Sequence, residues 1–188
     1  DLEQAHLLLG FDGISYNDDD FYTASVLSTL LGGGMSSRLF QEIREKHGLV
    51  YSVYSFISCY SDGGLFGVYA GSGGEESSRV MPLVCDEMRK VCEDVTEQEV
   101  QRTRSQLKAS ILMSLESTMS RCEQMARQIA VFGRPLSVEE VVAKIEAVDV
   151  EAVKKVAQRI VSSTPTLTAL GPVSGLEDYE ETVGRLAV

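Results

Sequence analysis

Histidine is scarce in this sequence: His6 and His47 are the only two among 188 residues. A catalytic zinc site usually needs three protein ligands and an open position, and two of the ligands are often histidines one helical turn apart. Neither histidine has a second one at that spacing, and no HxxEH or HxxxH pattern is present. We therefore expect no metal ligand, no bound cofactor and no catalytic residue in this chain.

Other patterns that carry catalysis are also missing. No serine lies in a G-x-S-x-G element, so a nucleophile elbow is not indicated. The run Gly32–Gly34 lacks the Gly-Lys-Ser/Thr that completes a phosphate-binding loop, and it follows a predicted helix rather than a strand. The four cysteines form no CxxC pair, which leaves a zinc ribbon or redox motif unsupported. Cys85 and Cys92 lie two helical turns apart, and we expect both to be buried core thiols.

Positive charge is in deficit. The chain has 17 Lys and Arg against 28 Asp and Glu, which gives a formal net charge of −11. Nucleic-acid binding needs clustered cations, so we expect no nucleic-acid partner. An acidic surface suits a basic peptide partner, and charge that serves only solubility is an equally good explanation.

Long apolar runs are missing as well. No stretch approaches the roughly 20 residues that cross a bilayer, and residues 1–4 carry neither a basic start nor an apolar signal core. We therefore expect no membrane insertion and no signal peptide. With reduced thiols, this favours a bacterial cytoplasmic or an organelle-matrix location.

The sequence does contain an ordered series of strand and helix patterns. Apolar, β-branched and aromatic residues predict four strands, at 6–11, 49–60, 65–71 and 166–171. Apolar residues at helical spacing predict helices between them, at 24–31, 36–48, 75–95, 96–132, 137–148 and 149–160. The pattern over 96–132 fits either one long helix or a helix kinked at 117–120.

Local signals support these boundaries. Thr96 with Glu99 and Ser137 with Glu140 are capping boxes, and Asp149 can cap the helix that follows it. A hairpin among helices implies the α+β class, with a largely antiparallel sheet covered on one face by several helices. Because no linker divides the chain, we expect a single domain over residues 1–188.

Residues 31–55, LGGGMSSRLFQEIREKHGLVYSVYS, stand out, and we call them the signature segment. Glycines are followed by a short amphipathic helix ending near Arg44, and then by a strand that opens at Tyr51. A guanidinium and a phenol can both donate hydrogen bonds to a peptide carbonyl or its oxyanion. Spacing alone favours a plainer interpretation, with Arg44 as a helix-end cation and Tyr51 as a half-buried strand aromatic.

The signature segment closely resembles the second, zinc-free half of the pitrilysin-type zinc metallopeptidases, in the branch of the processing proteases and mitochondrial processing peptidases. The resemblance continues through YSDGGLFGVYAG, FGRPLSVEEVVAKIEAV and TLTALGPV, so it covers nearly the whole chain. In that family two related halves close like a clamshell, and the first half carries HxxEH and the zinc. The family's substrate-binding Arg and Tyr, seven positions apart, fall on Arg44 and Tyr51.

The resemblance implies a substrate-binding, chamber-closing half of a metalloendopeptidase that hydrolyses peptides or targeting sequences. Its partners would be the zinc-binding N-terminal half of the same protein, a peptide substrate, and a second subunit in a homodimer or heterodimer. By itself the chain would be inactive, because it lacks HxxEH. Two alternatives remain open: a non-catalytic scaffold subunit or inactive homologue of the family, and a free-standing peptide-binding module.

Overall fold

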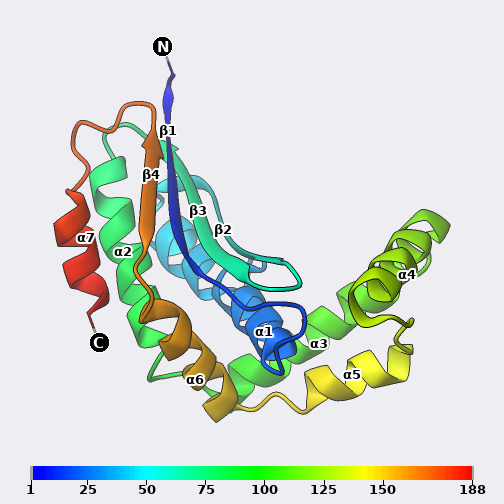
Figure 1. The fold of residues 1–188 in the computed structure, drawn as a ribbon. Coiled ribbons are helices and arrows are strands. Elements are labelled where there is room, and N and C mark those ends of the chain that lie inside the picture. Colours follow the sequence, from blue (N-terminus) through cyan, green and yellow to red (C-terminus); the bar gives the residue numbers. More distant parts are fainter. Residues whose placement is uncertain (1, 188) are drawn as a thin grey trace.

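The computed structural model describes residues 2–187 of the chain. Four strands and eight helical segments follow one another in nearly the predicted order (Figure 1). In chain order they are β1 Gln4–Asp12, α1 Phe21–Gly32, η1 Phe40–Lys46, β2 Val50–Cys59, β3 Gly64–Gly73, α2 Ser77–Lys90, α3 Glu97–Ser114, α4 Thr118–Phe132, α5 Val138–Glu146, α6 Val150–Val161, β4 Thr166–Leu170 and α7 Tyr179–Leu186. Helix α7 was not predicted.

The four strands form one antiparallel sheet in the order β2-β3-β1-β4. The predicted hairpin is β2 and β3, and the short β4 joins the opposite side of β1. This arrangement confirms the antiparallel α+β prediction. It also makes β2, which carries Tyr51, an edge strand of the sheet.

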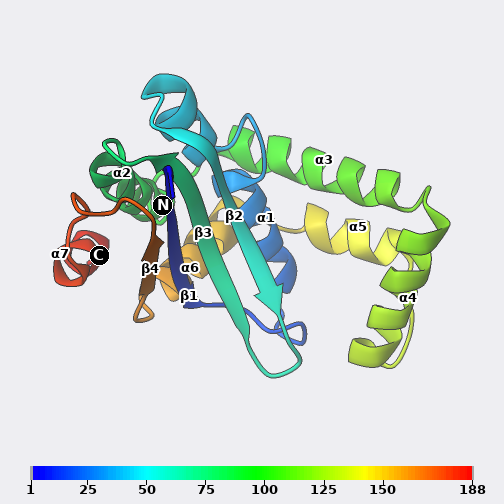
Figure 2. The ribbon, with the colours of Figure 1, turned by 90° about the horizontal axis from the view of Figure 1, so that it is seen from above.

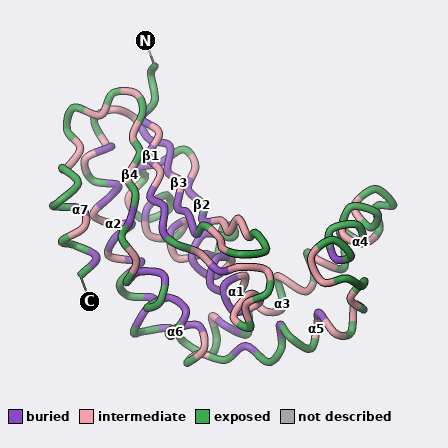
Figure 3. The backbone as a smooth tube through the Cα atoms, in the orientation of Figure 1, coloured by how far each residue is buried: buried purple, intermediate pink, exposed green. Residues whose placement is uncertain are grey.

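Alternating burial shows which face of the sheet is covered. In β1, Ala5, Leu7, Leu9 and Phe11 are each at most 2% exposed, whereas the intervening His6 and Leu8 are only partly buried. Helices α1, α2 and α6 contact β2, β3 and β1 respectively, on this side (Figures 1 and 2). Figure 3 shows the buried residues concentrated along the sheet and these helices. Period-two burial of this kind is what a sheet with one covered face requires.

One glycine fixes how closely α1 approaches the sheet. A Cβ added to Gly32 would lie 2.2 Å from the backbone nitrogen of Ser55 in β2, which real atoms do not tolerate. At the same contact the Ser55 hydroxyl donates a 2.6 Å hydrogen bond to the Ser28 carbonyl. The first residue of the glycine run therefore serves helix–strand packing.

Two predicted boundaries and one predicted capping box need correction. The pattern over 96–132 is two helices, because Ser117 accepts a hydrogen bond from the Ser120 N–H and so begins α4 as its cap. Helix α2 ends at Lys90, five residues before the predicted end, although Val91 and Val95 are still buried in the core. Only the Thr96 capping box is complete, since the Glu140 carboxylate binds Arg134 instead of returning to Ser137.

The two cysteines predicted to lie in the core are there. Cys85 and Cys92 are 0% and 1% exposed, and both are free thiols. Burial raises the pKa of Cys85 to about 12 and that of Cys92 to about 11. Both thiols are therefore protonated and unreactive at neutral pH.

Helix α4 stands away from the sheet at the far end of α3 (Figures 1 and 3). Of its residues only Gln128 is buried. Across the described residues 2–187, the structure has no helix with both the length and the apolar character needed to span a membrane.

Candidate substrate-contact site

Arg44 is carried by an unusual helix. The segment η1 is a π-helix, anchored by the fully buried Ile43 and closed by a hydrogen bond of 3.1 Å from the Gly48 N–H to the Arg44 carbonyl. Gly48 has a φ of +65°, a conformation that favours glycine and ends the helix. Short π-helical turns are rare and are found frequently at functional sites. The predicted amphipathic helix is thus present, with a geometry that the sequence pattern did not indicate.

The Arg44 side chain is exposed and keeps its donors free. Its guanidinium carbon lies 5.1 Å from the centre of the Phe40 ring, one turn earlier, and this cation–π contact favours the observed direction of the side chain. Within residues 2–187 no carboxylate lies at ion-pair distance from Arg44, whereas the nearby Lys46 pairs with Glu42 at 2.9 Å. Arg44 is therefore a cation that can bind an external acceptor.

Tyr51 occupies a β-bulge. Val50 pairs with Ser72 and Ser52 with Gly71, so Tyr51 is an extra residue between two regular pairs of β2 and β3. A bulge bends the strand and re-aims the side chain of the inserted residue, and bulges are common beside active sites. The Tyr51 side chain is 62% exposed. The half-buried position that spacing favoured is therefore wrong.

The two side chains flank one short turn. The Leu49 N–H donates a 3.1 Å hydrogen bond to the Ile43 carbonyl, which ties the start of β2 to the residue before Arg44. The turn stands at the end of the sheet seen at the top of Figure 2. Both groups lie outside the hydrophobic interior, and in the described structure no hydrogen bond joins them directly.

Arg38 fixes the start of this helical segment to α3. Its Nε and Nη2 donate to the two carboxylate oxygens of Glu99 at 2.7 and 2.9 Å, and its Nη1 donates to Asp94 at 2.5 Å. The Arg38 and Glu99 side chains are only 12% and 18% exposed. Such a bidentate pair is strong and directional.

The ionisation of Glu99 reflects this arrangement. Burial alone would raise the pKa of Glu99, but hydrogen bonds from Arg38 and Thr96 outweigh it and lower the pKa to about 2. The carboxylate therefore stays charged at neutral pH while it caps α3 and binds Arg38. The sequence indicated only the capping role.

Two more side chains of α3 hold the loop before η1. Gln106 donates to the Gly33 carbonyl at 2.9 Å, and Arg102 donates to the Ser36 carbonyl at 3.2 Å. Helix α3 thus binds the loop at three successive places. These contacts are separated by more than 60 residues in the sequence, and no local pattern predicts them.

The residues present do not fit a zinc site. Among residues 2–187 no group of three or more His, Cys, Asp or Glu side chains is placed to hold a metal ion. His6 Nδ1 is hydrogen-bonded to the Tyr69 hydroxyl at 2.7 Å, and His47 Nδ1 lies 2.8 Å from the Glu42 carbonyl. Both histidines are engaged within the fold, at a strand and at a helix end.

Comparison with known protein families gives a match over more than half of the chain. A family model described as "Peptidase M16 inactive domain" matches residues 1–107, which include the sheet strands β1 to β3, η1 and most of α3. The chain belongs to this M16 family. The resemblance of residues 31–55 to the zinc-free half of these metallopeptidases is thereby confirmed.

Curated relatives of this M16 domain are proteases by name. An uncharacterised zinc protease of Streptomyces coelicolor is 41% identical over 172 residues, which is 91% of this chain and 38% of that protein. An uncharacterised zinc protease of Bacillus subtilis is 34% identical over 171 residues, covering 90% of this chain and 42% of that protein. The alpha subunit of the mitochondrial-processing peptidase of Neurospora crassa is 36% identical over 172 residues. The match covers 83% of this chain and 30% of that protein.

A solved structure agrees on the fold. A chain of complex III2 from Candida albicans superposes with a TM-score of 0.90 at 22% identity, over all of this chain and 47% of that one. The M16 domain therefore spans less than half the length of these relatives.

Proposed function

We propose that this M16 inactive domain is the substrate-binding, chamber-closing half of a zinc metalloendopeptidase that hydrolyses peptides or targeting sequences. The names of the relatives, zinc protease and mitochondrial-processing peptidase, support this class of activity. The partner is a zinc-bearing half that carries HxxEH. The observation that carries the proposal is the exposed Arg44 guanidinium, held above Phe40 without an ion pair in the described structure.

In this proposal the domain contributes hydrogen-bond donors to the reaction. Arg44 offers several N–H donors in a planar fork, and Tyr51 offers one phenolic O–H. Directed at the carbonyl oxygen of the scissile peptide, these donors stabilise the negative charge that develops there as the carbonyl carbon becomes tetrahedral. The positive charge of Arg44 makes its hydrogen bond stronger in the transition state than in the bound substrate, and this difference accelerates the reaction.

The test uses the longer protein that contains both halves, with fluorescein-labelled casein as a general substrate. Arg44→Ala should lower kcat about tenfold to a thousandfold and Tyr51→Phe by a smaller factor, because each variant removes a donor to the developing oxyanion. Zinc content, measured by atomic absorption, should not change. Lys46→Ala, which removes an exposed cation from the same helix, is the matched control.

Normal kinetics in both variants would show that neither Arg44 nor Tyr51 takes part in the reaction. The signature segment would then serve packing only, as in a scaffold subunit or inactive homologue of the same family. Loss of zinc together with activity would instead indicate a structural defect that spreads to the other half.

A further inference from the structure

Helix α3 carries two sets of polar side chains that leave the helix in opposite directions. Glu99, Arg102 and Gln106 fall within about 60° of one another around the helix axis at 3.6 residues per turn. Arg104 and Lys108 fall within about 40° of one another, on the opposite side of the axis. We call the first set the loop flank and the second the α5 flank, because they bind different parts of the domain.

The loop flank follows the loop before η1. Its three members reach three successive positions, in reverse chain order: Gln106 the Gly33 carbonyl, Arg102 the Ser36 carbonyl and Glu99 the Arg38 guanidinium. The loop and α3 therefore run antiparallel along these contacts. Because separate turns of one helix supply them, the loop cannot tilt or slide against α3 without breaking at least one contact.

The loop transmits this constraint to η1. Gln41, in the first turn of η1, donates a 2.6 Å hydrogen bond from its side chain to the Met35 carbonyl. At the other end of η1, the Leu49 N–H binds the Ile43 carbonyl. The helical segment is thus held near both ends, and Arg44 lies between the two points of attachment.

The orientation of η1 decides where the Arg44 guanidinium lies. Side chains extend about 5–6 Å from a helix axis, so a rotation of roughly 10° displaces them by about 1 Å. Phe40 belongs to η1 and turns with it, so its contact with Arg44 does not fix the helix in the domain. The buried Leu39 and Ile43 hold η1 to the core, but apolar contacts are not directional.

We propose that the loop flank of α3 is a positioning element for Arg44. Glu99, Arg102 and Gln106 set the orientation of η1, and hence the place at which the guanidinium meets the scissile peptide. The proposal rests on the proposed function, because it assigns these three residues to the step that Arg44 serves. They act through the loop and η1 and do not contact the substrate.

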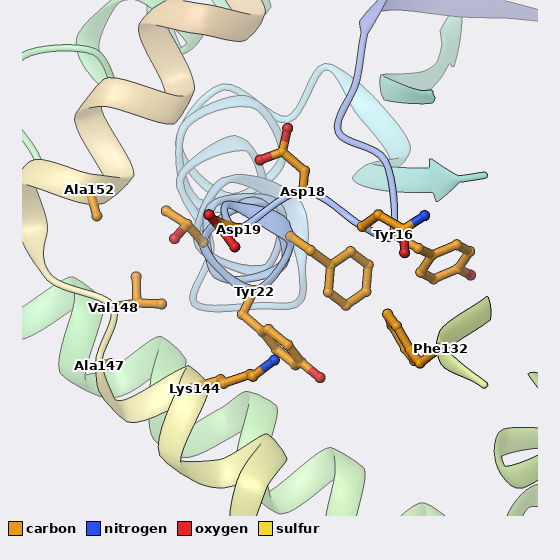
Figure 4. Close-up of a pocket in the computed structure, with 12 residues that line it drawn as sticks. Tyr16, Asp18, Asp19, Tyr22, Phe132, Lys144, Ala147, Val148 and Ala152 are labelled. Atoms are coloured by element: carbon orange, nitrogen blue, oxygen red, sulfur yellow. The ribbon is translucent and has the colours of Figure 1, made fainter. Parts of the chain in front are cut away.

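The α5 flank provides an internal control. Lys108 pairs with Glu146, at the C-terminal end of α5. Figure 4 shows Val148, two residues later, in a hollow with Tyr22 at the N-terminal end of α1. The signature segment follows the other end of α1, at Gly32, and the 12 residues of α1 span about 18 Å. A variant of Lys108 therefore disturbs α3 without disturbing the loop before η1.

The test is a double-mutant cycle in the longer protein with both halves, with labelled casein as substrate. Arg102→Ala and Gln106→Ala are combined as the flank variant, and both residues are exposed. The flank variant should lower kcat about tenfold and leave KM within about twofold, because a displacement of about 1 Å costs rate rather than binding. In an Arg44→Ala background it should lower kcat less than about twofold, since no guanidinium remains to be positioned. Lys108→Ala should change kcat less than about twofold in both backgrounds.

Hydrogen exchange in the 188-residue chain measures the positioning without any reaction. The N–H groups of Gly48 and Leu49 close the end of η1 through their hydrogen bonds to its carbonyls. In the flank variant both should exchange at least about tenfold faster, because local opening of η1 becomes easier. Lys108→Ala should leave the exchange of both amides unchanged.

Three results would overturn the inference. They are a native kcat in the flank variant, an equal fall of kcat with and without Arg44, and unchanged exchange at Gly48 and Leu49. Its failure is separable from that of the proposed function. A native kcat in Arg44→Ala alone would remove the proposed function, whereas the exchange measurement would still decide whether α3 holds η1.

Discussion

The helical part of the signature segment, which is η1 with the loop before it, lies outside the sheet, as does helix α4, yet the two are held in opposite ways. The signature segment receives a bidentate ion pair and two side-chain-to-carbonyl hydrogen bonds from α3. Helix α4 buries only Gln128 and exposes Met119, Met125 and Ile129 by at least half. The segment that presents Arg44 is thus positioned by directional contacts, whereas α4 contributes almost no buried residue to the core.

This difference indicates that the segment carrying Arg44 is held more rigidly than α4. Groups that bind a reacting peptide must be held within a fraction of an ångström, because small displacements cost large factors in rate. Charged pairs with fixed geometry meet this need better than apolar contacts, which are not directional. We infer that Arg38 and Glu99 position the helix that carries Arg44, without touching substrate themselves.

Among these substitutions, removal of Arg38 should lower the free energy of unfolding the most. Arg38→Met leaves the mostly buried carboxylate of Glu99 without its partner, and we expect the free energy of unfolding to fall by roughly 3 kcal/mol. Urea unfolding of the 188-residue chain measures this loss. Lys46→Ala, which breaks an exposed pair in the same segment, should cost at most about 1 kcal/mol. Equal effects would show that the Arg38 pair does not anchor the segment.

Lowering the pH should weaken the Arg38–Glu99 pair over a defined pH range. The pKa of Glu99 is about 2 in the folded chain against an ordinary value of 4.5. Ionised Glu99 therefore stabilises the folded state fully above about pH 4.5, and this contribution is lost as the pH falls toward 2. The stability difference between the native chain and Glu99→Gln should be largest near neutral pH and shrink below about pH 4.5.

Urea unfolding at several pH values tests this expectation. Glu140→Gln, at the exposed pair with Arg134, should give a smaller difference at every pH, because solvent screens that pair. A difference for Glu99→Gln that stays constant down to about pH 3 would contradict the assignment of the low pKa.

The smallest effect is expected on α4. Met125 is 50% exposed, and Met125→Gln should change the free energy of unfolding by no more than about 0.5 kcal/mol. The same substitution at Met88, which is 2% exposed in α2, should cost several kcal/mol because it buries an amide in the core. Comparable losses at both positions would mean that α4 is packed as firmly as α2.

Local chemistry made much of the fold predictable. The turn at 61–64 between two β-branched runs indicated the β2–β3 hairpin, and the Thr96 capping box marked the start of α3 to within one residue. Both signals act between residues close in sequence. The sequence left one long helix and a helix kinked at 117–120 as alternatives over 96–132, because the apolar phase continues through Ser117. Nothing local showed that Ser117 would turn extended and cap a new helix.

The candidate site was predictable only in part. Arg44 and Tyr51 came from the signature segment, and the structure exposes both. The π-helix, the bulge at Tyr51 and the Arg38–Glu99 pair depend on tertiary contacts, the last between residues 61 apart. Periodicity carries no information about such contacts, so the support of the site had to come from the structure.

The most direct measurement is chemical rescue of Arg44→Ala in the longer protein with both halves. We predict a reduced kcat that rises in a saturable way when methylguanidinium is added at non-denaturing concentrations, while the free energy of unfolding stays within about 0.5 kcal/mol of the native value. An undiminished kcat in Arg44→Ala, or a loss matched by a comparable loss of stability and not rescued, would contradict the claim that the Arg44 guanidinium serves the reaction.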